Sequence, residues 1–246
     1  MRRNEDLKYG PGQMDLYDLY LPDEGAFDLV IWFHGGGLEN GSRKGARFAE
    51  DLTKEGVGVA SVEYRMYPDA VFPQYILDCA RAVKHIMDEV ASKEQVKRVF
   101  ISGQSAGAYL TMMLMLNKAY LANAGVDRKR ITGFISDSAQ VTTHFNVLRE
   151  RGLDSRIERI DEAAPFYFLT PDANVNNLLM IWYENDMPCR PEQNRLFYQS
   201  AKRLCPGQNI CMKELPGGHC NGSVKRNEKG TYDYNDALLE FIRGLE

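Results

Sequence analysis

The chain has 246 residues and a formal net charge of −4, and 44% of its residues are hydrophobic. These values are typical of one globular domain and provide no basic surface for nucleic acid or for an anionic membrane. No apolar run approaches the roughly 18 to 20 residues that cross a bilayer, and the charged start at residues 1–6 has no signal-peptide core. We therefore expect a cytoplasmic protein without nucleic-acid or membrane partners.

The cysteines do not suggest a disulfide framework or a metal site. There are five, Cys79, Cys189, Cys205, Cys211 and Cys220, so their number is odd and their spacing is scattered. This pattern favours reduced thiols in a chain of this size. The spacing also matches no zinc motif, so we expect no structural metal.

The first half of the chain predicts strands and helices in alternation. Apolar or alternating runs rich in branched and aromatic residues indicate strands, and apolar positions three or four residues apart indicate helices. In chain order, the predicted elements are a strand over 14–21, a strand over 29–33, a helix over 48–54, a strand over 57–64, a helix over 72–90, a strand over 99–102 and a helix over 108–116. The helix over 108–116 is apolar nearly all round, which predicts a central, buried position.

The second half continues the alternation around one long insertion. Its predicted elements are a strand over 131–136, a strand over 178–183, a helix over 191–204, a strand over 210–215 and a helix over 234–245. Residues 137–172 predict two short helices, the second opened by a capping box from Ser155 to Glu158. Because long insertions between strands often border a site, we expect residues 139–172 to form a lid or a pocket wall.

This order of elements predicts an α/β fold with a mostly parallel central sheet and helices on both faces. No internal repeat, low-complexity tract or linker interrupts the sequence. We therefore interpret residues 1–246 as a single domain. In such sheets the carboxyl ends of the parallel strands share one edge, so the residues that follow the strands are candidates for a site.

The most informative turn follows the predicted strand at 99–102. Gly103, Ser105 and Gly107 form Gly-x-Ser-x-Gly between that strand and the buried helix. In this context the glycines allow a strained turn that exposes the serine hydroxyl, which becomes a nucleophile when a base lies within hydrogen-bond reach. The bare pattern also arises by chance in roughly one chain in ten of this length. The hypothesis therefore requires partners elsewhere in the chain.

A second glycine-rich turn, His34-Gly35-Gly36-Gly37, follows the apolar strand at 29–33. Three consecutive glycines directly after a buried strand rarely arise by chance at average glycine usage. They let backbone N–H groups approach a ligand without obstruction by side chains. The turn therefore predicts a cradle of backbone donors beside the serine.

A serine nucleophile requires a base, and the base requires a group that orients it. Four histidines are available: His34 in the glycine turn, His85 on the polar face of a helix, His144 in the long insertion and His219 after the last predicted strand. His219 is the candidate base, because its place after a strand puts it at the same sheet edge as the serine.

The orienting acid is expected after the next-to-last strand. Asp186 and Glu184 both lie there, and either could accept the N–H of His219. We favour Asp186, since it lies further from the strand, in the loop before Pro188. Ser105, Asp186 and His219 then converge on one edge of the sheet, and the sequence predicts a catalytic triad.

These motifs resemble those of the α/β-hydrolase superfamily, in which the triad follows the order serine, acid, histidine. Within the superfamily, the chain resembles hormone-sensitive-lipase-like and carbohydrate-esterase-like carboxylesterases. Glu63-Tyr64-Arg65 and Phe72-Pro73 add to the resemblance, which spans about 14–245. Ala108 stands where many members have a further glycine, a small departure that the turn can tolerate.

The resemblance implies an α/β-hydrolase fold and a role for each candidate residue. Ser105 would be the nucleophile, His219 the general base and Asp186 the orienting acid. The oxyanion hole would be formed by three backbone N–H groups, those of Gly36, Gly37 and Ala106. The chemistry would proceed through an acyl-enzyme and would require no metal or organic cofactor.

The expected activity is hydrolysis of a small-molecule ester with a short acyl group, and the resemblance implies acetyl or feruloyl esters of carbohydrates. Only about a dozen residues precede the first predicted strand, which predicts an open acyl pocket and argues against long-chain lipase activity. Two alternatives stay open. One is an amidase similar to arylformamidases, and the other is a non-catalytic binding protein on the same fold.

Overall fold

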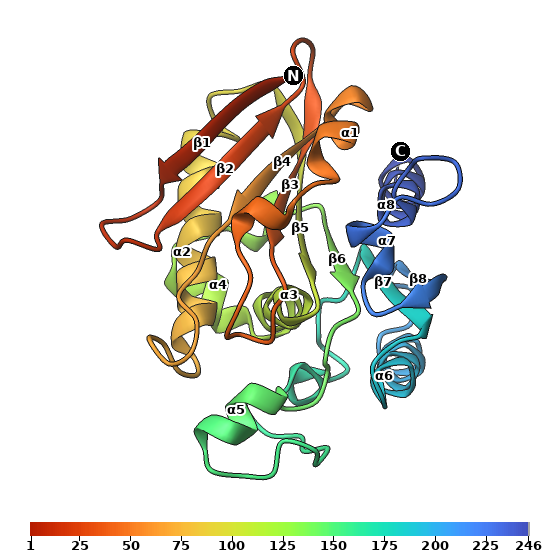
Figure 1. Ribbon diagram of the computed structural model, residues 1–246. Helices are drawn as coiled ribbons and strands as arrows, with labels where there is room; N and C mark the ends of the chain where they lie inside the picture. The colour runs from red at the N-terminus through yellow and green to blue at the C-terminus, as the bar shows by residue number, and fades with distance from the viewer. Residues whose placement is uncertain (246) are drawn as a thin grey trace.

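The computed structural model describes residues 1–245, and within them a single eight-stranded sheet organises the chain (Figure 1). The strand order is β1-β2-β4-β3-β5-β6-β7-β8. The strands are β1 Arg2–Lys8, β2 Leu16–Leu21, β3 Phe27–Phe33, β4 Val57–Val62, β5 Val96–Gln104, β6 Gly133–Asp137, β7 Leu178–Asn185 and β8 Ile210–Gly218. β1 and β2 pair antiparallel, β2 pairs antiparallel with β4, and the remaining pairs are parallel.

The helices cover both faces of this sheet (Figure 1). The α-helices are α1 Ala49–Lys54, α2 Gln74–Glu89, α3 Ala106–Leu116, α4 Lys118–Asn123, α5 Phe145–Glu150, α6 Arg190–Leu204, α7 Asn221–Val224 and α8 Asp233–Arg243. Three short 3₁₀ turns are η1 Arg43–Gly45, η2 Arg128–Arg130 and η3 Pro165–Phe168. The predicted α/β class, with a mostly parallel sheet between two layers of helices, is confirmed.

Two hydrophobic cores lie on opposite faces of the sheet, and β3 contributes to both. Leu29, Ile31 and Phe33 pack into the core that contains α2, α3 and α6. Val30 and Trp32, which alternate with them, pack into the core that contains α1 and α8. Successive side chains of a strand point to opposite faces, so a strand covered on both sides is apolar at every position. This explains the continuous apolar run in the sequence.

Helix α3 lies at the centre of the larger core, as predicted. All eleven of its residues are buried. The helix follows β5 directly and packs against β5 and β6. Its first residue, Ala106, comes immediately after Ser105, so a helix whose residues are all buried also positions the candidate nucleophile.

The strand β1 was missed by the sequence analysis. The expectation that about a dozen residues precede the first strand is wrong, because the first strand begins at Arg2. Most of its residues are exposed, and it pairs only with β2 at the edge of the sheet. Charged side chains are common on edge strands, where they discourage further pairing. With no buried face, the strand has no apolar alternation that could reveal it.

The second helix predicted for residues 137–172 is also wrong. The first is confirmed as α5, but the capping-box segment at Ser155 forms turns. The carboxylate of Glu158 does not return to the backbone at residue 155. Instead it accepts hydrogen bonds from Thr142 Oγ1 (2.7 Å) and Gln193 Nε2 (2.9 Å). These contacts with distant residues replace the local contact on which a capping box depends.

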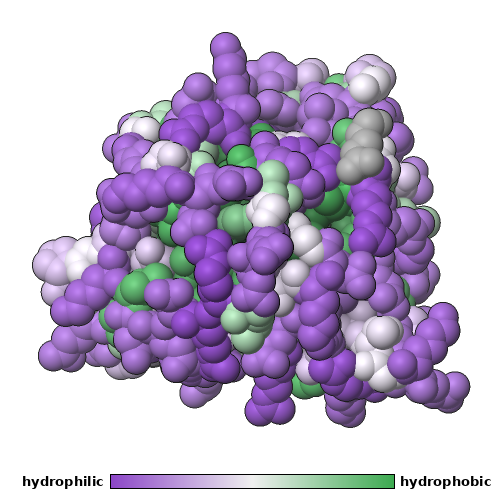
Figure 2. All heavy atoms as spheres, turned by 90° about the horizontal axis from the view of Figure 1, so that it is seen from above, coloured by the Kyte–Doolittle hydropathy of each residue, from purple (hydrophilic) through white to green (hydrophobic). Residues whose placement is uncertain are grey.

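The surface seen from above Figure 1 is mostly hydrophilic, and apolar side chains appear on it only in scattered areas (Figure 2). No helix among residues 1–245 combines the length and the apolar character needed to cross a membrane. Most of the apolar side chains of the chain belong to the two cores described above.

Candidate active site

Ser105 occupies a sharp turn between β5 and α3, with φ 54° and ψ −114°. This positive φ is uncommon for a residue with a side chain and marks local strain. A Cβ at Gly103 would lie 2.2 Å from the carbonyl carbon of Gly107, and a Cβ at Gly107 would lie 2.0 Å from the Phe33 carbonyl oxygen. Both glycines are therefore required by the close approach of the backbone on each side of the serine.

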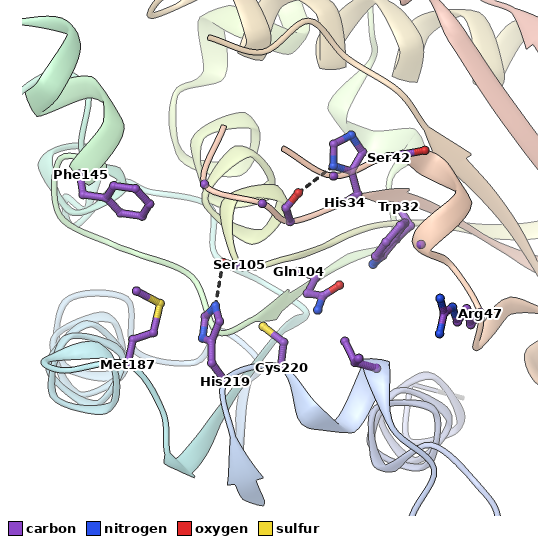
Figure 3. A pocket seen from close by; sticks show the side chains of 16 residues that line it. Trp32, His34, Ser42, Arg47, Gln104, Ser105, Phe145, Met187, His219 and Cys220 are labelled. Atoms are coloured by element: carbon purple, nitrogen blue, oxygen red, sulfur yellow. Dashed lines mark hydrogen bonds between the residues drawn. The ribbon is translucent and has the colours of Figure 1, made fainter. Parts of the chain in front are cut away.

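The structure brings Ser105, His219 and Asp186 together. The Ser105 hydroxyl lies 2.8 Å from His219 Nε2 (Figure 3). On the other side of the ring, His219 Nδ1 lies 2.5 Å from Asp186 Oδ1. A carboxylate can only accept, so Nδ1–H donates to Asp186 and Nε2 is left to accept the serine proton. The three side chains form one continuous chain of hydrogen bonds from carboxylate to hydroxyl.

Strand register explains this convergence. Asn185 of β7 pairs with Gly218 of β8, and Asp186 and His219 are the next residues on the two strands. In the same way, Gln104 of β5 pairs with Asp137 of β6, immediately before Ser105. The candidate residues therefore follow matched positions at the carboxyl edge of the sheet, where sites of open α/β sheets form.

Asp186 rather than Glu184 contacts the histidine. Glu184 is exposed, whereas the carboxylate of Asp186 is fully buried. Burial opposes ionisation of Asp186, but hydrogen bonds from His219 and Ser138 outweigh it, so the pKa of Asp186 lies below its usual value. The carboxylate is therefore ionised at neutral pH and can orient the imidazole.

Ser138 is a member of this cluster that the sequence analysis missed. Its hydroxyl donates to Asp186 Oδ2 (2.5 Å) and lies 3.0 Å from His219 Nδ1. The residue has φ 61° and follows the end of β6. The Arg190 side chain, through Nη1, donates to its carbonyl oxygen (2.7 Å). The available signal was its position, since it comes two residues after the predicted strand at 131–136.

The glycine turn lies beside the serine. Gly36 and Gly37 have positive φ values of 111° and 68°, and both line the same cavity as Ser105. A Cβ at Gly35 would lie 3.1 Å from the Ser105 Cβ, which shows how closely the two turns pack. Within residues 1–245, the backbone N–H groups of Gly36, Gly37 and Ala106 have no acceptor. These donors are available to a ligand at the position expected for an oxyanion hole.

A buried polar network holds the glycine turn from behind. His34 is 2% exposed, and its Nε2 lies 2.8 Å from Glu63 Oε1. The Tyr64 hydroxyl donates to the His34 carbonyl oxygen (2.7 Å), and the two rings stack. Arg43 Nη1 donates to Glu63 Oε2 (3.1 Å). Burial alone would raise the pKa of Glu63. The hydrogen bond from His34 and the guanidinium of Arg43 outweigh this effect, so the pKa lies below its usual value and the carboxylate is ionised.

The two other histidines do not reach the site. His144 is buried at the start of α5, where its Nδ1 accepts the Asn146 N–H (3.2 Å), and burial lowers its pKa well below the usual value. His85 is half-buried and contacts the edge of the Tyr17 ring. Neither histidine contacts Ser105 within the described residues, so His219 is the histidine that the structure places beside the serine.

The site opens into a cavity of about 520 Å³. Its wall includes Ser105 and His219 together with side chains from several segments (Figure 3). Phe145 and Met187 lie on one side of the Ser105–His219 pair, and Trp32 and Arg47 lie on the other. Phe145 belongs to α5, so the long insertion contributes a side chain to this cavity.

This fold, with a strained serine turn between a central strand and a buried helix, defines the α/β-hydrolase class. The chain belongs to the BD-FAE family, whose model matches residues 17–199. That match covers β2 through most of α6, and it includes the glycine turn and the serine turn.

Among curated proteins, the chain is similar to neutral cholesterol ester hydrolase 1 of Mus musculus, with 37% identity over 112 residues, which are 42% of this chain and 27% of that protein. It is also similar to the probable isoprenylcysteine alpha-carbonyl methylesterase ICMEL1 of Oryza sativa subsp. japonica, with 28% identity over 45% of this chain and 27% of that protein. The matched regions span about a quarter of the length of these relatives.

Solved structures share the fold over almost the whole chain. Esterase B from Lactobacillus rhamnosis has a TM-score of 0.80 and 15% identity, and the match covers 98% of this chain and 85% of that one. A truncated carbohydrate esterase from gut microbiota has a TM-score of 0.76 and 17% identity, covering 99% and 96%. At these identities the likeness establishes the fold.

Proposed function

We propose that this protein is a serine carboxylesterase that hydrolyses short-acyl esters of small molecules. The observation that carries the proposal is the continuous hydrogen-bond chain from Asp186 through His219 to Ser105, whose hydroxyl opens into the cavity. The ester hydrolases among the relatives and the structural neighbours support the same class of reaction. The alternative of a binding protein that lacks a working triad receives no support from this geometry.

In the proposed reaction, the Ser105 oxygen attacks the ester carbonyl carbon while His219 Nε2 accepts the hydroxyl proton. Asp186 accepts a hydrogen bond from Nδ1–H of the imidazolium that forms, and its negative charge stabilises the positive ring. The tetrahedral intermediate collapses when His219 protonates the leaving alcohol, which leaves an acyl-enzyme on Ser105. Water, activated by the same histidine, then releases the acid. Apart from the ester and one water molecule, the proposed steps use side chains and backbone groups of this chain.

The negative charge that forms on the carbonyl oxygen would be stabilised by the N–H groups of Gly36, Gly37 and Ala106. Their lack of an acceptor within residues 1–245 supports this role, because the donors are oriented before the substrate binds. Removal of one such donor typically costs about 3 to 4 kcal/mol of activation free energy. His34 and Glu63 hold the turn that presents two of the three donors.

The substrate class that we propose is a short acyl ester, such as an acetyl or feruloyl ester of a carbohydrate. The similarity to a carbohydrate esterase of gut microbiota supports this choice. Phe145 and Met187 offer a limited apolar wall beside Ser105, which suits a short acyl chain. We also propose that residues 139–172 act as a pocket insertion through Phe145.

Hydrolysis of 4-nitrophenyl acetate by the wild-type chain and by Ser105→Ala tests this proposal. We expect the substitution to lower kcat by at least about a thousandfold, because removal of a triad nucleophile leaves only oxyanion and binding contributions. Ser200→Ala, in α6 and outside the cavity wall, is the matched control and should keep wild-type activity. Undiminished hydrolysis by Ser105→Ala would overturn the assignment.

A paired substrate comparison separates the ester preference from the amidase alternative. The chain should hydrolyse phenyl formate faster than formanilide at equal enzyme concentration, beyond the ratio of their uncatalysed rates. A preference for formanilide would assign the site to amide hydrolysis instead.

A further inference from the structure

Among residues 1–245, no carboxylate lines the cavity beside Ser105. Its wall residues are Trp32, His34, Gly35, Gly36, Gly37, Gly41, Ser42, Gly45, Arg47, Gln104, Ser105, Phe145, Met187, His219, Cys220 and Val224. Arg47 is the residue of this wall whose charge is permanent, because a guanidinium does not lose its proton in proteins. The cavity is therefore cationic on a chain whose formal net charge is −4.

The Arg47 guanidinium has no partner among residues 1–245. The side chain is exposed, and neither a hydrogen bond nor an ion pair is formed by it. Two arginines on segments that border the cavity are neutralised. Arg149 pairs with Glu39 (2.6 Å) from α5, and Arg226 pairs with Asp51 (2.6 Å). Arg149 and Arg226 are thus each neutralised by a carboxylate, whereas Arg47 is not.

A second donor on the same side of the cavity also lacks an acceptor. Trp32 lines the cavity, and its indole Nε1 is buried without a hydrogen-bond partner in the described part of the chain. Figure 3 shows Trp32 and Arg47 together on the side of Ser105 that lies away from Phe145 and Met187. One side of the cavity is apolar, and the other contains the exposed Arg47 guanidinium and a buried indole N–H without an acceptor among the described residues.

We propose that the preferred substrate is an ester that carries an anionic group, such as a carboxylate, and that Arg47 binds this group. The proposal rests on the proposed esterase function and names its substrate class. A planar guanidinium forms paired hydrogen bonds with a carboxylate, and these are stronger than bonds between neutral groups. The apolar wall at Phe145 and Met187 would then accept the uncharged part of the ester.

The anionic group could stand on the acyl part or on the alcohol part of the ester, and two matched pairs of substrates distinguish these sources. The acyl pair is mono-4-nitrophenyl glutarate and 4-nitrophenyl butyrate. The alcohol pair is 4-acetoxybenzoate and methyl 4-acetoxybenzoate. The measured quantity is the ratio of kcat/KM for the anionic ester to kcat/KM for its neutral counterpart, which cancels general losses of activity.

We expect the wild-type ratio to exceed one in at least one pair and to fall about tenfold in Arg47→Gln. Arg47→Lys keeps the charge and should retain part of the preference, since lysine lacks the planar fork. Arg203→Gln, on α6 outside the cavity wall, removes the same charge from the chain and should leave the ratio unchanged. Raising the salt concentration to 0.5 M should reduce the wild-type ratio by screening.

A wild-type ratio below one in both pairs, or a ratio that Arg47→Gln leaves unaltered, would overturn the proposal. A binding measurement separates this failure from failure of the esterase function. Calorimetric titration of Ser105→Ala with the same four esters should show tighter binding of an anionic ester, and the preference should disappear in Ser105→Ala/Arg47→Gln. Such a binding preference without turnover by the wild type would retain the Arg47 assignment and reject the esterase function.

Discussion

Ser138 connects two parts of the candidate site that are far apart in the chain. It follows β6, yet its hydroxyl donates to the Asp186 carboxylate that follows β7. That carboxylate receives a second hydrogen bond from His219 on its other oxygen. A carboxylate with both oxygens engaged has little freedom to rotate, so we propose that Ser138 positions Asp186, the candidate orienting acid.

We expect Ser138→Ala to lower kcat for 4-nitrophenyl acetate about ten- to a hundredfold and to leave KM nearly unchanged, because one hydrogen bond to a charged group is worth about 1.5 to 3 kcal/mol. Ser136→Ala is the matched control. The Ser136 hydroxyl is buried on β6, two residues before Ser138, and has no partner among the described residues, so its loss should not affect kcat. Equal effects of the two substitutions on kcat would indicate a packing effect and reject the positioning role.

Asp137 is a buried carboxyl group beside the site that the proposed reaction does not use. Its Oδ2 accepts a hydrogen bond from Ser223 (2.8 Å), and its Oδ1 has no partner within the described chain. Its backbone oxygen accepts the Ser105 N–H (2.7 Å). Burial raises the pKa of Asp137 to about 6, although the hydrogen bond from Ser223 opposes the shift.

This raised pKa predicts a stability change with a defined sign. The folded chain holds the Asp137 proton more tightly than the unfolded chain, where an aspartate titrates near 3.9. Its contribution to the free energy of unfolding is therefore largest below about pH 4 and falls as the pH rises through 6, by about 2 kcal/mol between pH 4 and pH 7.5.

Urea unfolding of the wild type and of Asp137→Asn at these two pH values measures this contribution. The free-energy difference between variant and wild type should shift by about 2 kcal/mol in favour of the variant at the higher pH. Asp69→Asn, at an exposed position, should show no such shift. A constant difference for Asp137→Asn across the range would mean that this carboxyl group titrates normally.

At the scale of elements, the serine turn depends on how closely α3 approaches β3. The backbone of Gly107 in α3 lies so near the end of β3 that a Cβ would be 2.0 Å from the Phe33 carbonyl oxygen and 2.6 Å from that of His34. This contact joins the helix after the nucleophile to the strand that leads into the glycine turn. One close packing contact thereby sets the distance between the two turns.

Gly107→Ala should lower the free energy of unfolding by about 3 kcal/mol or more, because a backbone carbonyl cannot move away as a flexible side chain can. Gly45→Ala provides the comparison, since a Cβ there would meet only the Trp32 ring at 3.7 Å, an ordinary contact. Chemical unfolding of both variants gives the two values. A cost for Gly107→Ala no greater than that for Gly45→Ala would show that the approach is less restrictive than the geometry indicates.

At the scale of the whole molecule, the sheet register assembles the site. The residues before Ser105 and Ser138 pair across β5 and β6, and the residues before Asp186 and His219 pair across β7 and β8. The last members of each parallel pair therefore emerge side by side. Hydrophobic cores on both faces hold these strands in place, so the packing of the sheet determines the geometry of the site.

The features that could be predicted from the sequence are those that depend on neighbours along the chain. The apolar run before His34 predicted a buried strand, and the glycines around Ser105 predicted a sharp turn. Both predictions were possible because side-chain periodicity and backbone sterics act over a few residues. The order of strands and helices then restricted the fold to a parallel sheet with one functional edge. This was enough to select Ser105 and His219 as candidates.

The remaining features depend on groups that meet only in the folded chain. The choice of Asp186 over Glu184 requires the position of His219, 33 residues away from Asp186, and the contact of Ser138 with Asp186 spans 48 residues. Glu158 does not form the predicted helix cap, because its carboxylate instead accepts hydrogen bonds from the distant side chains of Thr142 and Gln193. Contacts at such separations follow from strand register and packing, which no local pattern of residues encodes.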